Sequence, residues 1–121
     1  IKDYATKNSW KDATKYNSVK FDEVTTLTLN NASINSGKYY TSDDSWRLYY
    51  SELTQIVIKS SLTIKSIKFT YSNTKNGILV FNETKYASNK TITLNSKTAT
   101  IDLSGDAENA TLKITAITIE Y

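Results

Sequence analysis

Large hydrophobic residues alternate with polar residues along most of this chain, and one alternating pattern occurs twice. Residues 64–71 read Ile-Lys-Ser-Ile-Lys-Phe-Thr-Tyr, and residues 114–121 read Ile-Thr-Ala-Ile-Thr-Ile-Glu-Tyr. In each copy the last three large residues occupy every second position, which places them on one face of an extended strand. The pattern predicts two similar β-strands in one core. We expect deep burial of Ile67, Phe69, Ile117 and Ile119.

Further strand-like segments are separated by turn-forming residues, and no segment of a dozen residues shows a helical stripe. Asn76-Gly77 is the strongest short hairpin signal, because a type I′ turn requires positive φ at both central residues. It predicts a positive φ for Gly77 and antiparallel pairing of residues 67–71 with 78–81. The first twenty residues fit neither period. The predicted strands are 24–29, 39–41, 46–50, 53–59, 62–71, 78–81, 91–94, 98–103 and 112–121.

Nine short strands with this spacing predict an all-β fold, in which two antiparallel sheets pack as a β-sandwich of jelly-roll or related Greek-key topology. The length of 121 residues suits a single domain spanning residues 1–121. We expect this domain to be monomeric. The chain contains no Met, which indicates a processed or excised part of a longer protein and predicts covalent linkage to other domains.

The absence of two residue types excludes many kinds of active site. The chain contains neither Cys nor His. Without Cys there is no disulfide, no thiolate nucleophile and no Cys-based metal site. Without His the chain lacks the side chain used most often for acid–base catalysis near neutral pH and for binding catalytic zinc. Most hydrolase and metalloenzyme arrangements are therefore excluded.

Three polar groupings match chemical motifs only in spacing. Ser72 and Lys75 have the Ser-x-x-Lys spacing of serine–lysine enzymes, but that pair acts from a helix and here falls in a predicted turn. Residues 102–108 place oxygen ligands around a glycine without EF-hand spacing, which is more typical of a hydrated acidic turn than of a calcium loop. The adjacent carboxylates at 22–23 and 43–44 do not define a glycosidase pair. We expect no catalytic residue, no enzymatic activity, no metal site and no cofactor.

Charge and hydropathy bear on partners and location. The net charge of +3 arises from scattered lysines interleaved with Asp and Glu, whereas nucleic-acid binders concentrate Lys and Arg in one stripe. Nucleic acid is therefore not an expected partner. No apolar run approaches the ~20 residues that cross a bilayer, so we expect no membrane insertion. Abundant Ser, Thr, Asn and Tyr are common in extracellular bacterial modules, and we expect an extracellular or cell-surface location.

The most informative cluster spans residues 39–50, where five aromatic residues and the only arginine occupy twelve positions. If Leu48 points into the core, strand alternation places Trp46 and Tyr50 inside and leaves Arg47 and Tyr49 on the opposite face. An exposed Tyr beside a guanidinium, flanked by Asp43 and Asp44, is a surface suited to sugars, because the ring stacks on C–H groups and the charges bind hydroxyls. The alternative is that the aromatic residues occur on this sheet face only because they favour β-strands, and that Arg47 pairs with a nearby carboxylate rather than with a ligand.

Several segments together resemble a β-sandwich module of secreted and cell-surface proteins from gut-type Firmicutes and Bacteroidetes. The resemblance runs nearly end to end, and it is carried by residues 8–10, 35–40, 46–49, 63–71 and 114–121, with the Gly-Lys-Tyr-Tyr and Trp-Arg-x-Tyr blocks the most specific. Such modules are appended to enzymes, adhesins or surface lipoproteins, and their architecture is similar to that of carbohydrate-binding modules. The chain departs from the family at residues 107–110, where Ala-Glu-Asn-Ala replaces an Asn-Gly-Gln type of sequence.

The sequence thus predicts a non-catalytic carbohydrate-binding or adhesive accessory module of an exported bacterial protein, with a polysaccharide or other glycan as its ligand. Two alternatives remain open: a structural spacer domain, and an accessory domain of a secreted hydrolase or nuclease with no ligand of its own. A binding module is expected to expose its aromatic rings together, whereas a spacer buries or scatters them. The candidate ligand-binding residues are Tyr40, Asp43, Asp44, Arg47, Tyr49 and Trp10.

Overall fold

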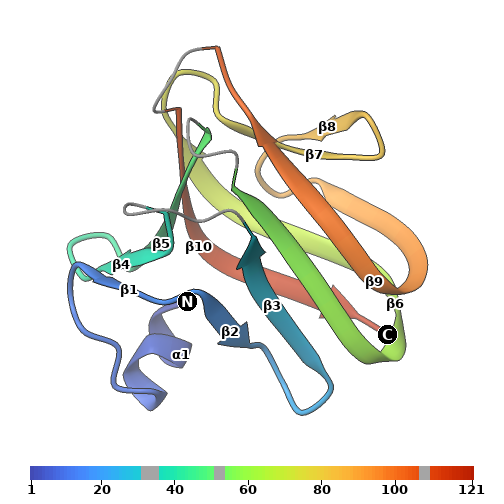
Figure 1. Ribbon diagram of the computed structural model, residues 1–121, viewed down its shortest axis with the longest axis horizontal. Helices are drawn as coiled ribbons and strands as arrows, with labels where there is room; N and C mark the ends of the chain where they lie inside the picture. The colour runs from blue at the N-terminus through green and yellow to red at the C-terminus, as the bar shows by residue number, and fades with distance from the viewer. Residues whose placement is uncertain (31–35, 51–53, 107–109) are drawn as a thin grey trace.

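The computed structural model describes residues 1–30, 36–50, 54–106 and 110–121. These residues form one short helix and an antiparallel sheet of ten strands (Figure 1), so the predicted all-β class is confirmed. The helix is α1 (Lys2–Lys7). The strands are β1 (Thr14–Lys15), β2 (Ser18–Lys20), β3 (Thr25–Asn30), β4 (Lys38–Tyr40), β5 (Ser45–Tyr49), β6 (Gln55–Asn73), β7 (Ile78–Phe81), β8 (Thr84–Tyr86), β9 (Thr91–Ser104) and β10 (Thr111–Glu120).

The sheet order is β1-β4-β5-β10-β6-β9-β7-β8, with β3 also paired to β6 and β2 paired to β3. The first part of β6 pairs with β3, its last part pairs with β10, and β9 pairs with both parts. In Figure 1 β6 turns back at the lower right, near the C terminus. The sheet folds over at this corner and encloses one core, which is consistent with a β-sandwich. The jelly-roll or Greek-key topology stays a prediction.

One hydrophobic core receives side chains from both halves of the folded sheet. Leu27, Ile56 and Ile101 come from the half that contains β3, and Phe69 and Trp46 come from the half that contains β5. Their burial follows strand alternation, because every second residue of each strand points inward. The largest fully buried side chains are Trp46, Phe69, Leu27, Leu48, Ile56, Ile58, Ile64, Ile67, Leu79, Ile92, Ile101 and Leu112.

The two copies of the repeated pattern are hydrogen-bonded neighbours in this sheet. They run antiparallel within β6 and β10, with Ile117 opposite Phe69 and Ile119 opposite Ile67. Each copy contains an Ile-x-x-Ile step, which would place the two isoleucines on opposite faces of a regular strand. The pairing register shifts after Ile64 in β6 and after Ile114 in β10. A bulge at each step restores the inward direction of the next isoleucine.

The burial predicted for the repeat is right for one copy and wrong for the other. Ile67 is fully buried and Phe69 is 2% exposed, whereas Ile117 and Ile119 are half-buried and pack against the edge of the core. The physical reason is position: the C-terminal part of β10 lies beyond the segment that β5 covers, which ends at the Ile114–Trp46 pair. The repeated pattern therefore predicts the face of each residue but not how deeply it is buried.

The turn around residues 74–77 differs from the predicted hairpin in two ways. The central residues are Lys75 and Asn76, with φ values of 50° and 54°, and the Gly77 amide closes the turn by donating to the Thr74 carbonyl at 2.9 Å. Gly77 itself does not have positive φ. The turn also leads β7 to pair with β8 and β9 rather than with β6. The positive φ predicted for Asn76 is therefore confirmed, whereas the positive φ predicted for Gly77 and the predicted strand partner are wrong.

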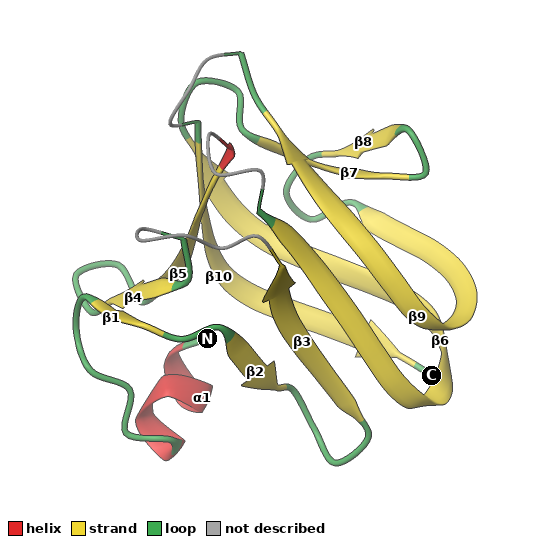
Figure 2. Ribbon diagram, in the orientation of Figure 1, coloured by secondary structure: helices red, strands yellow, loops and turns green. Residues whose placement is uncertain are grey.

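Several strand limits also differ from prediction. The segments predicted at 53–59 and 62–71 form the single bent strand β6, with residue 53 outside the described part of the chain, and those at 91–94 and 98–103 form β9. The short strands β1, β2 and β8 carry no clear alternation and were not predicted. In the same way α1 has only six residues, too few for a helical stripe to be visible. Figure 2 shows it beside β2.

The repeated strands provide a test of core depth. Phe69→Ala should lower the free energy of unfolding by about 3–5 kcal/mol, because it removes a large buried ring and leaves a cavity. Ile117→Ala should cost less than about 2 kcal/mol, because that side chain is only half-buried. Chemical denaturation of both variants and the wild type measures the difference. Equal losses would contradict the burial described for the two copies.

A second test concerns Gly77. A Cβ atom at this position would lie 3.0 Å from Leu112 Cδ1 and 3.0 Å from the Thr111 carbonyl oxygen. Gly77→Val should therefore destabilise the fold by about 1–3 kcal/mol through overpacking, although the backbone there is not left-handed. Thermal unfolding measures the loss, with Lys90→Val as an exposed control in another turn. Equal melting temperatures for Gly77→Val and the wild type would show that the neighbouring strand accommodates the added atoms.

Candidate functional site

The hairpin of β4 and β5 positions most of the predicted site residues. It pairs Tyr39 with Trp46, and β5 pairs in turn with β10. Trp46 and Leu48 are fully buried, so the interpretation that they form part of the core is confirmed. Alternation then places Arg47 and Tyr49 on the outer face, where both are half-buried.

Trp46 is held by its ring nitrogen as well as by packing. Its Nε1–H lies 3.0 Å from the Tyr16 carbonyl oxygen and 3.0 Å from the Gly37 carbonyl oxygen, and donates to both. Gly37 has a φ of 92°, a left-handed conformation that glycine adopts without strain. These contacts join the N-terminal segment and the start of β4 to β5, which fixes the face that Arg47 presents.

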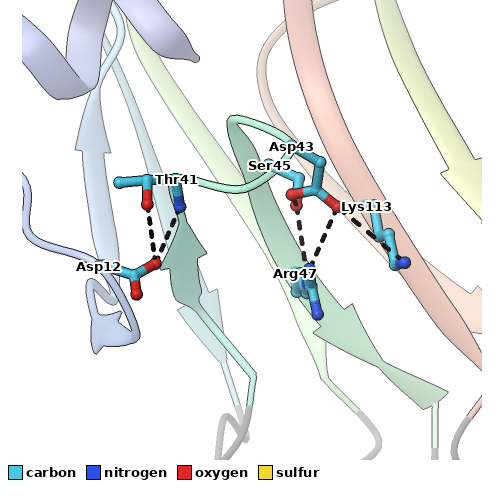
Figure 3. A network of polar contacts seen from close by, with 6 residues as sticks. All are labelled: Asp12, Thr41, Asp43, Ser45, Arg47 and Lys113. Atoms are coloured by element: carbon cyan, nitrogen blue, oxygen red, sulfur yellow. Dashed lines mark hydrogen bonds and ion pairs between the residues drawn. The ribbon is translucent and has the colours of Figure 1, made fainter.

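Arg47 lies in a network of polar contacts on that outer face (Figure 3). Its Nη2 donates to Asp43 Oδ2 at 3.1 Å and its Nε donates to Ser45 Oγ at 3.3 Å. The Ser45 hydroxyl donates to the other Asp43 oxygen at 2.5 Å, and Lys113 Nζ lies 4.0 Å from Asp43. The carboxylate pairing considered as an alternative for Arg47 is therefore present.

The surroundings of Asp43 change its acidity. Burial raises the pKa of this carboxyl, but the hydrogen bond from Ser45 and the positive charges of Arg47 and Lys113 outweigh burial and hold the pKa below its usual value. The ionised form is thus favoured near neutral pH. A charged carboxylate at this point keeps the guanidinium in one orientation.

Tyr40 completes this outer-face group. The Arg47 guanidinium carbon lies 3.8 Å from the centre of the Tyr40 ring, which is cation–π geometry. Tyr40 and Lys38 share one face of β4, and Lys38 lies directly opposite Arg47 on β5. One face of the ring is therefore covered by a cation. We name Tyr40, Asp43, Arg47 and Tyr49 the outer-face group.

The other two predicted site residues lie apart from this group. Asp44 accepts a hydrogen bond from the Tyr39 hydroxyl at 2.8 Å, and Tyr39 is buried on the inner face of β4. Trp10 also contacts Tyr39, at 5.7 Å between ring centres, and it stacks on Tyr16 at 4.2 Å with an interplanar angle of 3°. The structure therefore brings Trp10 and Asp44 together with Tyr39 and not with Arg47; both lie outside the strands, in the loop before β1 and in the turn before β5.

Trp10 instead belongs to an aromatic cluster that closes one end of the core. Tyr4 from α1 meets its edge at 5.2 Å between ring centres, and Trp10, Tyr4 and the inner residues pack together. This cluster accounts for the unassigned aromatic spacing of the N-terminal segment, since its members come from a helix, a loop and a strand. Burial and the hydrogen bond to Asp44 raise the pKa of Tyr39 to about 12.

The turn between β4 and β5 is fixed from outside the hairpin. Asp12 Oδ1 accepts hydrogen bonds from the Thr41 amide at 2.9 Å and from the Thr41 hydroxyl at 3.2 Å (Figure 3). Asp43 and Asp44 lie in this turn, between the strands predicted at 39–41 and 46–50, and Asp44 adopts a φ of 50° within it. The segment that carries Asp43 is thus held at both ends, which limits the motion of the outer-face group.

Sequence reasoning missed Lys38, Ser45 and Lys113, although each lies beside Arg47. Lys113 is 66 positions away along the chain, and it reaches Arg47 only because β10 pairs with β5 in this register. No motif in a single sequence gives that register. The signal that was present is weaker: each residue occupies a polar position in an alternating segment.

The remaining motif candidates lie elsewhere. Ser72 is the second-last residue of β6, and Lys75 lies in the following turn rather than on a helix. Asp102 accepts a hydrogen bond from Gln55 at 2.7 Å and Asp106 accepts one from Asn76; residue 108 lies outside the described part of the chain. Among the described residues, no three His, Cys, Asp or Glu side chains gather as metal ligands, and no described helix has the length and apolarity to cross a membrane.

Comparison with protein-family models, with curated proteins and with solved structures found no match. The predicted resemblance to surface modules therefore stays a prediction. Interpretation of the site depends on its geometry alone: a fixed guanidinium, a carboxylate and two half-buried tyrosines on the outer face of the sheet.

The acidity of Asp43 gives a testable pH dependence. Because its pKa is lowered in the folded protein, its contribution to stability is present above the ordinary carboxyl pKa and is lost as the pH falls through the folded value. Asp43→Asn should thus be less stable than the wild type near neutral pH, and the difference should shrink in acid. Thermal unfolding as a function of pH measures this, with the exposed Glu120→Gln as control. A difference that does not vary with pH would contradict the argument.

Proposed function

We propose that this chain is a non-catalytic carbohydrate-binding or adhesive accessory module of an exported bacterial protein. The observation that carries the proposal is the outer-face group, in which Arg47 lies over the Tyr40 ring and is fixed by Asp43, with Tyr49 two positions further along β5. Aromatic rings bind the C–H faces of sugars, while charged groups exchange hydrogen bonds with hydroxyls. Both kinds of group are present on one sheet face.

Rigidity supports binding at so shallow a surface. Side chains that are already ordered lose little conformational freedom when a ligand binds, so more of the interaction energy appears as affinity. The side chain of Arg47 is only 19% exposed, and it is held by Asp43 and Ser45. The ring of Tyr40 is held by the guanidinium. We expect dissociation constants in the micromolar to millimolar range, about −8 to −4 kcal/mol, as suits one or two stacking rings.

The location and setting of the module are part of the same proposal. They rest on a composition rich in Ser, Thr, Asn and Tyr and on the resemblance carried by residues 35–40 and 46–49. In this setting the domain attaches a larger exported protein to a glycan. A spacer domain has no such ligand. Because Trp10 and Tyr16 stack on each other, this pair favours neither a binding module nor a spacer.

Two variants test the role of the outer face. Tyr49→Ala should abolish glycan binding with little loss of stability, because the side chain lies outside the core. Arg47→Lys should weaken binding, since an ammonium keeps the charge but loses the planar donor geometry. A glycan array followed by calorimetry on the positive glycans measures both effects, and circular dichroism checks the fold.

The control is Leu62→Ala, which removes an exposed apolar side chain at the β6 corner. It should leave binding unchanged. Failure of the wild-type domain to bind any glycan, or full binding by Tyr49→Ala, would overturn the proposal and favour the structural spacer.

A further inference from the structure

A row of four basic side chains crosses the outer face of the sheet. The register places Lys15 of β1 opposite Lys38 of β4, Lys38 opposite Arg47 of β5, and Arg47 opposite Lys113 of β10. Residues directly opposite in an antiparallel sheet project from the same face, so the four cations lie side by side on adjacent strands. We name Lys15, Lys38, Arg47 and Lys113 the basic row.

This arrangement is unfavourable for the protein alone. Like charges directly opposite each other on paired strands destabilise the sheet, and the basic row contains three such pairs in succession. Among the described residues Asp43 is the carboxylate that pairs with Arg47 and Lys113, and no ion pair there involves Lys38. Asp43 therefore offsets the repulsion at Arg47 and Lys113, but no ion pair of the described residues offsets the repulsion between Lys38 and Arg47.

Lysines elsewhere on the outer faces are arranged differently. Lys59 of β6 lies opposite Thr26 on one side and Thr98 on the other. Lys68, further along β6, lies opposite Thr91 and Thr118. An uncharged neighbour on each side avoids the repulsion that the basic row contains. Lys59 and Lys68 therefore lack the like-charge neighbours that the cations of the basic row have on adjacent strands.

We propose that the basic row is the binding site for an acidic polysaccharide that carries carboxylates on successive sugars. This inference rests on the proposed function and names its ligand class. Strands lie about 4.8 Å apart, so a chain that crosses them meets a new cation at each strand. Bound carboxylates relieve the repulsion among the cations, and a local conflict of this kind is characteristic of functional sites.

The neighbouring groups suit a sugar chain more than a nucleic acid. The carboxylate of Asp43 lies within the basic row, at 3.1 Å from Arg47 and 4.0 Å from Lys113. It accepts hydrogen bonds from sugar hydroxyls, whereas it repels the phosphates of a nucleic acid. Tyr40 lies beside the row, on the same face of β4 as Lys38, and supplies an aromatic surface for a sugar ring.

The experiment uses polygalacturonate and the same polymer with its carboxylates methyl-esterified. The two differ in charge but share a backbone, so their comparison isolates the ionic contribution. Isothermal titration calorimetry should show at least about tenfold tighter binding of polygalacturonate, equivalent to 1.4 kcal/mol. Affinity for polygalacturonate should fall with added salt, because salt screens exposed charges. Chondroitin sulfate and single-stranded DNA test other polyanions.

Variants locate the site. Lys38→Gln and Lys113→Gln should each weaken polygalacturonate binding about three- to tenfold, as expected for loss of one exposed charge contact. Lys38→Gln should also raise the melting temperature of the free protein, because it removes repulsion from both neighbours. Lys59→Gln makes the same chemical change on the other half of the sheet and should alter neither quantity.

The outcomes separate this inference from the proposed function. Equal affinity for the charged and esterified polymers, or unchanged binding by Lys38→Gln and Lys113→Gln, would overturn the inference while glycan binding itself stands. Binding of DNA or chondroitin sulfate as tight as that of polygalacturonate would overturn the choice of a carboxylated glycan. Absence of binding to every glycan would overturn both proposals.

Discussion

The burial of Trp46 is the constraint on which the rest of the site depends. Its indole ring fills the core, and its N–H donates to the carbonyls of Tyr16 and Gly37. Moving β5 by one residue in register would expose this ring and bury Arg47, because strand side chains alternate. The cost of burying an unpaired guanidinium excludes that alternative. The direction of Arg47 is therefore set by its neighbour in sequence.

The residues that face the core were largely predictable, whereas their partners were not. Alternation in residues 46–50 and 67–71 gave the correct inner faces, since hydrophobic burial is encoded locally. The turn at residues 74–77 was found, but its positive φ values fall on Lys75 and Asn76, and β7 pairs with β9. Strand pairing depends on contacts between distant segments, and a single sequence does not specify them.

In the candidate site too, local groupings were predictable and strand partners were not. Tyr40, Asp43 and Arg47 were grouped correctly because they lie on one hairpin, where local periodicity is sufficient. Trp10 and Asp44 contact Tyr39 instead, and since both lie outside the strands, strand alternation gave no prediction of where they point. Lys38 and Lys113 were missed because they join Arg47 through pairing alone. Scattered lysines in the sequence thus become an aligned set once the register is known.

Asp43 gives the aligned cations a specific character. Without a carboxylate, adjacent cations on a sheet attract any polyanion in proportion to its charge. With Asp43 fixed between Arg47 and Lys113, part of that general attraction is cancelled and a hydrogen-bond acceptor is added. For the binding site proposed above, a ligand would gain full affinity only if it presented anions to the lysines and hydroxyl donors to the carboxylate. Specificity of this kind comes from penalising the wrong partner as well as binding the right one, and acidic sugars meet both requirements.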